Sequence, residues 1–320
     1  MAQDMMRSHV VVLGDACVDM VIRLPDRTRG TPDLTNSLPQ LHGGGSAANV
    51  AVGLVRLGVA VVMVAAVGDD GYGRWVKEDL VREGVDVQGI CTIRDAFTPM
   101  VMALIESDGE RLVVAWPPEG GAHLQLTPDA VDWTSIESAS WLHTTGMCLR
   151  ASPAREATLR AMQLARKIGV KVSIDLNLRL ESWDLDEQTR SEFERAIELS
   201  DVVFGNAKEE IMPMARSESV EAAVHLLCNG ERIIVARQGD RGALVATPKE
   251  TFHAPAFHTQ VVDTLGAGDA FDGGFIAACL AKVDAREAAR WGNAVAALKI
   301  GRVGARGLPS LEDLKQMLGH

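Results

Sequence analysis

The chain has 320 residues, a hydrophobic content of 47% and a formal net charge of −11 at pH 7. This length suffices for one large α/β domain, and the apolar content suffices for a buried core. The acidic charge argues against a surface that binds nucleic acid or an anionic membrane, because both need a clustered basic face. A small ligand is the better expectation.

Cysteine usage and the amino-terminal sequence indicate a compartment. The five cysteines are scattered, without a Cys-x-x-Cys pair or the histidine spacing of a zinc site. Isolated thiols in apolar surroundings are typical of reduced core residues. Residues 1–9 lack an apolar signal core, and no apolar stretch approaches the ~20 residues of a membrane span. We therefore expect a cytoplasmic protein.

The first predicted strand, at residues 9–14, is a β-branched run closed by glycine, which is typical of a buried strand in a covered sheet. Two acidic residues, Asp15 and Asp19, follow it. Open α/β sheets bind their ligands just past the carboxyl ends of such strands. Either aspartate could equally be a turn or helix-cap residue.

Three glycines at residues 43–45 precede a predicted helix of small residues. Glycines such as Gly44 and Gly45 let the main chain approach a ligand closely, and Asn49 falls near the first turn of the helix. A flexible loop with a helix cap would give the same pattern. The segment is not a nucleotide P-loop, because no Gly-Lys-Ser/Thr sequence follows it.

Two regions, at about residues 15–42 and 97–118, are predicted as extended chain. In the second, residues 100–105 and 111–115 alternate around a turn predicted at 107–109, and the two regions together could form a small separate sheet. From about residue 129 onward, strand and helix patterns alternate, which predicts a mainly parallel sheet with helices on both faces. We therefore expect a single domain over the whole chain, residues 1–320.

Polar side chains follow the strand predicted at residues 171–175. Asp175, Asn177 and Arg179 alternate there, and an acid, an amide and a guanidinium group can hold hydroxyls, a carboxylate or a phosphate. A loop network that is satisfied within the protein is the alternative.

A second polar pair, Asn206 and Glu209, follows the next predicted strand. The two residues are one helical turn apart, as in a helix-cap pair or as oxygen ligands of water-bound Mg²⁺. The cap interpretation is favoured when the pair is considered alone. Further on, Arg237 opens a turn that contains Gly239 and Gly242 between two strands, which is the pattern of a hairpin.

Segment 263–271 combines acids with a small-residue turn. Gly266-Ala267-Gly268 precedes a helix predicted at 272–281, so its amides should lie at a helix N-terminus, where phosphate is stabilised. Asp269 could be an N-cap, or it could accept a proton from an alcohol that attacks the phosphate. A second acid, Asp263, precedes the glycines, so capping alone does not account for the segment.

Two of these motifs resemble those of one enzyme family. Asp-Thr-x-Gly-Ala-Gly-Asp-x-Phe at 263–271 resembles the C-terminal signature of the ribokinase-like (pfkB) carbohydrate kinases. Gly-Gly-x-x-x-Asn at 44–49, with residues 67–73, resembles the N-terminal sugar-binding signature of the same family. The resemblance covers residues 14–309. It implies a ribokinase-like three-layer α/β fold with a mainly parallel central sheet and a small β lid over the sugar.

The resemblance also implies residue roles. The catalytic set is the base Asp269 with an anion hole made of Gly266, Ala267 and Gly268. The substrate-binding set consists of Asp15, Asp19, Gly44, Gly45, Asn49, Asn177, Arg179 and Asp269. The nucleotide-binding set consists of Asn206, Arg237, Gly239, Gly242, Thr264, Gly266, Gly268 and Asn293. The set that organises the metal consists of Asn206, Glu209 and Asp263.

The implied reaction is ATP-dependent phosphorylation of a hydroxyl on a small sugar or sugar acid, of the fructokinase, 2-keto-3-deoxygluconate kinase or ribokinase type. ATP and Mg²⁺ are the implied cofactors. Whether the protein uses K⁺ is left open, because Leu308 stands where relatives that bind a monovalent cation often have a small polar residue. A homodimer joined through the lid is expected, without nucleic acid or membrane partners.

The resemblance restricts the identity of the substrate only in part. In the family, Asp-x-Asn-x-Arg followed by a tryptophan, here Trp183, is typical of members that act on fructose, 2-keto-3-deoxygluconate and related acids. Against an anionic sugar, segment 116–121 lacks the arginine that such kinases often carry. Two alternatives remain: a nucleoside kinase of the same fold, which the few aromatic residues of the lid disfavour, and a non-catalytic sugar-sensing module.

Overall fold

The computed structural model describes residues 9–24, 38–106, 111–117, 119–180 and 182–319. The described chain forms a nine-stranded sheet in the order β13-β12-β11-β10-β9-β8-β1-β4-β5. Its strands are β1 (His9–Leu13), β4 (Ala60–Gly68), β5 (Ile90–Ile93), β8 (Trp141–Thr145), β9 (Lys171–Asp175), β10 (Val202–Asn206), β11 (Ile233–Arg237), β12 (Ala243–Ala246) and β13 (Thr251–Ala254). The strands from β5 to β11 pair in parallel, and β12 and β13 add an antiparallel edge. The sequence prediction of a mainly parallel sheet is confirmed.

The central strands are hydrophobic throughout because both faces of the sheet are covered. In β1, Val10 and Val12 join the core on one face, whereas Val11 and Leu13 join the core on the other. A strand that is buried on both sides needs no polar alternation, which explains the uninterrupted apolar run seen in the sequence.

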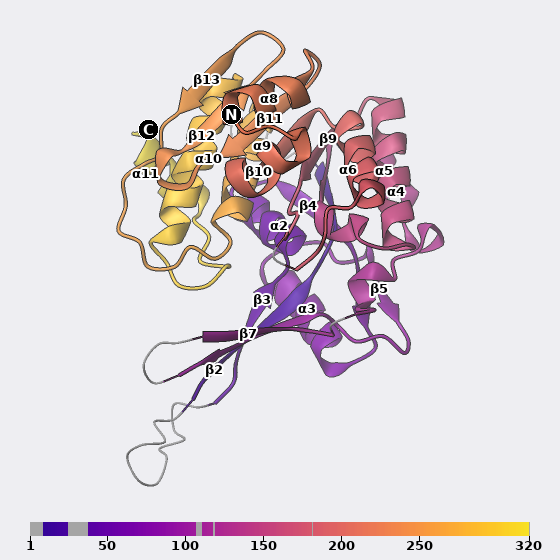
Figure 1. The fold of residues 1–320 in the computed structure, drawn as a ribbon. Coiled ribbons are helices and arrows are strands. Elements are labelled where there is room, and N and C mark those ends of the chain that lie inside the picture. Colours follow the sequence, from indigo (N-terminus) through magenta and orange to yellow (C-terminus); the bar gives the residue numbers. More distant parts are fainter. Residues whose placement is uncertain (1–8, 25–37, 107–110, 118, 181, 320) are drawn as a thin grey trace.

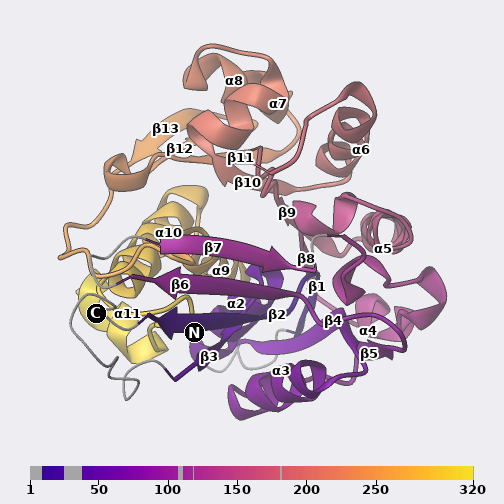
Figure 2. The ribbon, with the colours of Figure 1, turned by 60° about the horizontal axis from the view of Figure 1, so that its bottom comes forward.

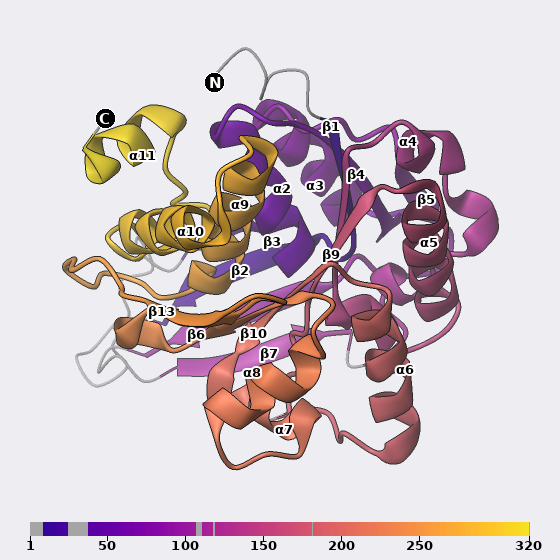
Figure 3. The same ribbon diagram turned by 90° about the horizontal axis from the view of Figure 1, so that it is seen from above.

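Helices cover the two faces, as Figure 3 shows, and give three layers. One face is covered by α2 (Ser46–Arg56), α3 (Gly71–Arg82), α9 (Ala267–Leu280), α10 (Ala285–Ile300) and α11 (Leu311–Leu318). The other face is covered by α4 (Trp133–Glu137), α5 (Ala154–Ile168), α6 (Glu187–Glu198), α7 (Met212–Ala215) and α8 (Val220–Cys228). Short turns are η1 (Ala122–Leu124), η2 (Pro128–Ala130), η3 (Gly146–Leu149), η4 (Ala207–Ile211) and η5 (Gly239–Arg241). None of the described helices has the length and apolarity that crossing a bilayer requires.

A second sheet projects from the main body at one edge (Figures 1 and 2). It has four strands in the order β3-β2-β6-β7 within the described chain. They are β2 (Cys17–Arg23), β3 (Gln40–Gly44), β6 (Met100–Ile105) and β7 (Arg111–Trp116). These strands lie in the two regions predicted as extended chain. Residues 25–37, 107–110 and 118 of those regions, which include the predicted turn at 107–109, lie outside the described residues.

Helix α9 begins earlier than the sequence predicted. The predicted start was residue 272, whereas the helix starts at Ala267 and follows Gly266, which has φ 76°. The helix is buried on all sides from Ala270 to Ala278, so it has no amphipathic stripe to mark its first turn. Asp269 therefore lies inside the first turn of the helix and is not its N-cap.

Candidate active site

The carboxyl ends of the central strands meet at one edge of the large sheet, because these strands run parallel. β9 ends at Asp175, β10 at Asn206 and β11 at Arg237, so three predicted site residues lie along this edge. β2 follows β1 directly, which attaches the four-stranded sheet to the same edge. The candidate active site therefore lies between the two sheets.

Asp269 is held by two residues of another helix. Its Oδ1 accepts a hydrogen bond from Ser46 Oγ at 2.6 Å, and its Oδ2 accepts one from Asn49 Nδ2 at 2.8 Å. Both donors come from α2, so the first turns of α2 and α9 converge on this carboxylate. Burial raises the pKa of Asp269 to about 6, and the two hydrogen bonds oppose that shift. The group is thus a base that is ionised near neutral pH.

The glycine turn before Asp269 starts α9 close to a guanidinium group. Gly266 adopts the left-handed conformation that glycine tolerates. The amide of Ala267 donates to Thr264 O at 3.2 Å, and the amides of the next residues have no acceptor within the helix by helix geometry. A methyl group at Gly268 would lie 3.0 Å from Nη1 of Arg237. The start of α9 therefore offers amides backed by a positive charge.

Asp15 holds the start of α2. Its carboxylate accepts from the amides of Ser46 at 2.8 Å and Ala47 at 3.3 Å, and from Thr145 Oγ1 at 3.0 Å. These contacts correspond to the cap interpretation of the sequence. Asp15 thus positions the helix that carries the two donors to Asp269.

Asp19 lies on β2, where it pairs with His42 of β3 and its carboxylate reaches toward Gly44. A methyl group at Gly44 would come within 2.4 Å of its carboxylate, so the strands pack this closely only with glycine there. Gly45 has φ 94°, and a methyl group on it would lie 2.6 Å from the carbonyl oxygen of Asp15. Burial raises the pKa of Asp19, and the positive charge of Arg306 opposes this. The glycine run therefore brings the main chain against the carboxylate of Asp19 and the main chain of Asp15.

The loop after β9 has an unusual main-chain conformation. Asn177 and Arg179 have φ 41° and 49°, in the left-handed region that few non-glycine residues adopt. The side chain of Asn177 is buried, whereas that of Arg179 is exposed. Such strain persists only where the surroundings hold it, and it is frequent in ligand-binding loops.

Arg237 is surrounded by three carboxylates. Its Nη2 lies 2.8 Å from Asp175 and 3.7 Å from Glu210, and its Nη1 lies 2.8 Å from Asp272. Burial raises the pKa of Glu210 to about 7. The resemblance placed Arg237 in the nucleotide-binding set, whereas its described partners are these acids. The cluster ties the loops after β9 and β10 to α9.

Neither Glu210 nor Asp272 was assigned to the site from the sequence. Glu210 follows the Asn-x-x-Glu motif directly, and its carboxylate accepts from the amides of Leu178 and Asn206. Asp272 lies within α9 and is fully buried. The signal in the sequence was an acid among the small residues of a helix. If such a helix is buried, the acid needs a charged partner.

The predicted metal residues are partly engaged within the protein. Asn206 Oδ1 accepts from the amides of Lys208 at 2.9 Å and Glu209 at 3.1 Å, which is the cap arrangement. The Glu209 side chain is exposed. Asp263 accepts from main-chain amides through both carboxylate oxygens. Among the described residues, no group of three or more His, Cys, Asp or Glu side chains is arranged to hold a metal ion.

The remaining nucleotide candidates lie beyond β11. Gly239 and Gly242 form the turn between β11 and β12, and a methyl group at Gly242 would lie 2.1 Å from Ala254 O. Asn293 on α10 donates to the same Ala254 O at 3.1 Å. Thr264 is exposed beside the glycine turn. Gly242 and Asn293 therefore both lie against the end of β13.

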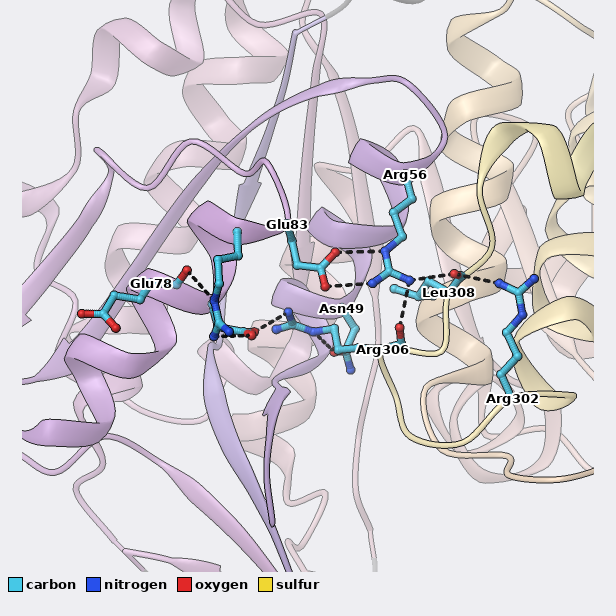
Figure 4. Close-up of polar contacts among 9 residues, drawn as sticks. Asn49, Arg56, Glu78, Glu83, Arg302, Arg306 and Leu308 are labelled. Carbon is cyan, nitrogen blue, oxygen red and sulfur yellow. Dashed lines mark hydrogen bonds and ion pairs between the residues drawn. The ribbon is translucent and has the colours of Figure 1, made fainter.

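Sequence analysis missed Arg306, which Figure 4 shows next to Asn49. Its Nε donates to Asn49 Oδ1 at 2.9 Å, and its Nη1 pairs with Asp79 of α3 at 3.0 Å. A methyl group at Gly43 would lie 2.7 Å from its Cζ, so β3 packs on the guanidinium. An arginine in a loop of small residues was the signal. It links the C-terminal loop to the residue that binds Asp269.

That loop is itself held along α2. Arg56 donates to the carbonyl oxygens of Leu308 at 2.8 Å and Arg306 at 3.1 Å, and it pairs with Glu83 (Figure 4). Arg302 donates to the same Leu308 oxygen at 3.1 Å. The main chain around Arg306 is therefore fixed from two sides.

Comparison with known proteins identifies the family of the chain. The model of the pfkB family carbohydrate kinases matches residues 7–312. The chain is 30% identical to the 5-dehydro-2-deoxygluconokinase of Shouchella clausii, over 97% of this chain and 95% of that protein. It is 33% identical to the ATP-dependent ribose-1-phosphate kinase of Halopiger xanaduensis, over 98% of each chain.

The fold agrees with a solved structure as well. A fructokinase double mutant from Vibrio cholerae O395, solved with fructose, ADP and a potassium ion, superimposes with a TM-score of 0.82 at 28% identity. The match covers 97% of this chain and 98% of that chain. The predictions of a ribokinase-like fold and of a phosphotransferase with an alcohol acceptor are confirmed. This chain belongs to the pfkB family of carbohydrate kinases.

Proposed function

We propose that the protein transfers the γ-phosphoryl group of ATP to a hydroxyl of a small sugar or sugar acid, with Asp269 as the base. One observation carries the proposal: a partly buried carboxylate is fixed by Ser46 and Asn49 in the first turn of α9, beside the glycine turn. The names of the relatives, a 5-dehydro-2-deoxygluconokinase and a ribose-1-phosphate kinase, support this class of substrate.

The chemistry follows from the placement of these groups. Asp269 takes the proton of the attacking hydroxyl, whose oxygen forms a bond to the γ-phosphorus while the bond to the ADP oxygen breaks. Because the pKa of Asp269 is about 6, the carboxylate is ionised at neutral pH. The amide of Gly268 at the start of α9 stabilises the charge on the transferred group, the Ala267 amide holds the turn by donating to Thr264 O, and Arg237 lies behind Gly268.

We assign the sugar to the space between the two sheets. Asp19, Gly44, Gly45 and Asn49 bound it on one side. Asn177 and Arg179 extend from the loop after β9 and complete the substrate set together with Asp15, which acts through α2. In this arrangement the four-stranded sheet covers the sugar as a lid.

The nucleotide lies along the turn between β11 and β12, with Gly239, Gly242, Thr264 and Asn293 around it. Of the predicted metal residues, the exposed Glu209 would hold Mg²⁺, because Asn206 and Asp263 already accept main-chain hydrogen bonds. When bound, Mg²⁺ neutralises phosphate charge. The residues of the chain orient the hydroxyl and take its proton.

The experiment is a panel of acceptors with the Asp269→Asn variant. ADP release is measured with hexoses, ketoses, aldonic and keto acids, pentose phosphates and nucleosides. On the active acceptor, we expect Asp269→Asn to lower kcat by roughly 10²–10⁴-fold, the usual contribution of a general base, with ATP affinity retained. A near-normal kcat for this variant contradicts the base assignment.

The panel also separates the alternatives. Turnover of nucleosides alone would favour the nucleoside kinase. Rises in melting temperature with sugars, without turnover of any acceptor, would favour the sugar-sensing module. The intact Asp269 and glycine turn lead us to expect turnover.

A further inference from the structure

Lys299 is a fully buried lysine near the end of α10, with 0% of its surface exposed. Its Nζ donates to the main-chain oxygen of Asp263 at 2.8 Å. Burial of an ammonium group is costly unless the charge is compensated. A methionine or leucine would fill the same space without that cost, so the charge itself calls for an explanation.

Asp263, the residue that Lys299 contacts, is hydrogen-bonded at its amide, at its main-chain oxygen and at its carboxylate. The amide of Asp263 donates to Ile300 O at 3.0 Å. Its carboxylate accepts from the amides of Leu265 at 3.0 Å and Gly304 at 2.8 Å. With the bond from Lys299, the residue that opens the glycine turn is bound to the end of α10 and to the C-terminal loop.

The surroundings compensate the charge of Lys299. The ammonium group lies near the carboxyl end of α10, where the helix dipole favours a cation. Burial lowers the pKa of Lys299, whereas the carboxylates of Asp263 and Asp269 oppose that shift. The positive charge thus sits between α10 and the turn that leads to the base.

This position bears on the open question of K⁺. The related fructokinase structure contains a potassium ion, and the C-terminal loop here has Leu308 in place of a small polar residue. Hard cations bind oxygen atoms, and the main-chain oxygen of Asp263 is one such acceptor at this turn. In this protein the ammonium of Lys299 already binds that oxygen, so the residues do not fit an added cation.

We infer that Lys299 is a positioning residue that acts as a built-in monovalent cation, fixing the turn at residues 263–268 so that the protein needs no K⁺. The inference rests on the proposed kinase function for its effect on turnover. Its effect on the turn is independent of the reaction and is measurable on the protein without a substrate.

The first test uses the unmodified protein. The melting temperature, with and without ADP, and kcat on the active acceptor are measured in KCl, NaCl and tetramethylammonium chloride at equal ionic strength. We expect no difference among the three salts. A clear rise in melting temperature or a several-fold rise in kcat in KCl overturns the inference, whatever the variants do.

The second test uses two variants. Lys299→Ala removes the charge and leaves room for an ion, whereas Lys299→Met removes the charge and keeps most of the volume. We expect both to lower kcat by about 10–100-fold through misplacement of the turn. Only Lys299→Ala should regain melting temperature and kcat with K⁺, NH₄⁺ or methylammonium, and tetramethylammonium should not restore either.

A control variant and two further outcomes distinguish a failure of this inference from a failure of the proposed function. Lys315→Met, at an exposed position on α11, should behave as the unmodified protein in all salts. If Lys299→Met retains full kcat and stability, the charge has no role and the inference fails. If no acceptor is phosphorylated but Lys299→Ala gains melting temperature in K⁺, the built-in cation stands and the proposed function fails.

Discussion

Asp269 is the middle of a row of hydrogen bonds that starts in the C-terminal loop. Arg306 donates to Asn49, and Asn49 donates to Asp269. Arginine has donors only, so the amide oxygen of Asn49 must face Arg306 and its nitrogen must face Asp269. The orientation of one amide, and with it a hydrogen bond that lowers the pKa of the base, is therefore set by a residue that does not touch Asp269.

This predicts a pH effect for Arg306→Met. The base acts when ionised, so kcat/KM should fall as the pH drops through its pKa, near 6 in the unmodified protein. Without Arg306 the Asn49 amide is no longer fixed, the donor to Asp269 weakens, and the pKa of the base rises. The acid limb of the kcat/KM profile should then move to higher pH.

A neighbouring arginine supplies the control. Arg302→Met removes bonds to Leu308 and Asp313 in the same region, while Arg56 still holds the carbonyl oxygens of Leu308 and Arg306, so the bond from Arg306 to Asn49 stays in place. Its acid limb should coincide with that of the unmodified protein. An Arg306→Met profile with the same acid limb as Arg302→Met would show that Arg306 does not set the orientation of Asn49.

Motif spacing found only part of the candidate site. Asp269, Gly44 and Asn49 stand in ordered local motifs, so the sequence singled them out. Ser46 binds Asp269 across 223 positions, and no local pattern encodes such a contact. Lys299 was missed for the same reason, because it resembles an ordinary helix residue until the tertiary fold buries it.

The contact of α9 with α10 depends on small residues at the crossing. A methyl group at Gly274 would lie 2.9 Å from Val295, 3.0 Å from Trp291 O and 3.1 Å from Gly292 Cα. These distances are shorter than ordinary contacts, so the helices approach closely only because this position has no side chain. The crossing fixes the helix whose first turn carries Asp269.

Two adjacent glycines of α9 give a matched pair of variants. We expect Gly274→Ala to lower the free energy of unfolding by about 1–3 kcal/mol through overpacking. A methyl group at Gly273 meets its nearest atoms at 3.7–3.8 Å, so Gly273→Ala should be neutral or stabilise by up to about 1 kcal/mol through helix propensity. Denaturant unfolding measures both, and equal values would contradict the packing argument.

The sequence predicted two kinds of element best. These are helices that are buried on one side and strands that are buried on both sides. The strands β1 and β9 followed from short apolar runs, and the alternation of strands and helices after about residue 129 followed from the pattern along the chain. The start of α9 did not, because a helix buried on all sides lacks a periodic stripe. Its small residues reflect packing against α2 and α10, which the sequence alone does not reveal.

At the scale of the whole molecule, the four-stranded sheet has apolar side chains in contact with solvent. Leu112 and Val113 on its edge strand β7 are 60% and 59% exposed, and Trp116 on the same strand is also exposed. An exposed edge strand with such side chains is a pairing surface that monomers avoid. We propose that two copies of the protein associate through this sheet.

We predict that the protein is a dimer and that a single charged substitution in β7 disrupts it. Sedimentation should give a dimer for the unmodified protein, and Val113→Lys should shift it toward monomer, because the added ammonium would be buried in the contact. Leu226→Lys on α8 replaces a side chain that is 61% exposed, away from this sheet, and should remain dimeric. A monomer at every concentration for the unmodified protein would exclude the association.

The 223 positions between Ser46 and Asp269 also have a consequence for biosynthesis. The amino-terminal third of a growing chain emerges from the ribosome with its two donors in place but without their carboxylate partner, and Arg306 follows later still. With Asp269 as the proposed base, a product that ends before residue 269 would lack the group that takes the proton of the hydroxyl. Such a product should not transfer the phosphoryl group of ATP.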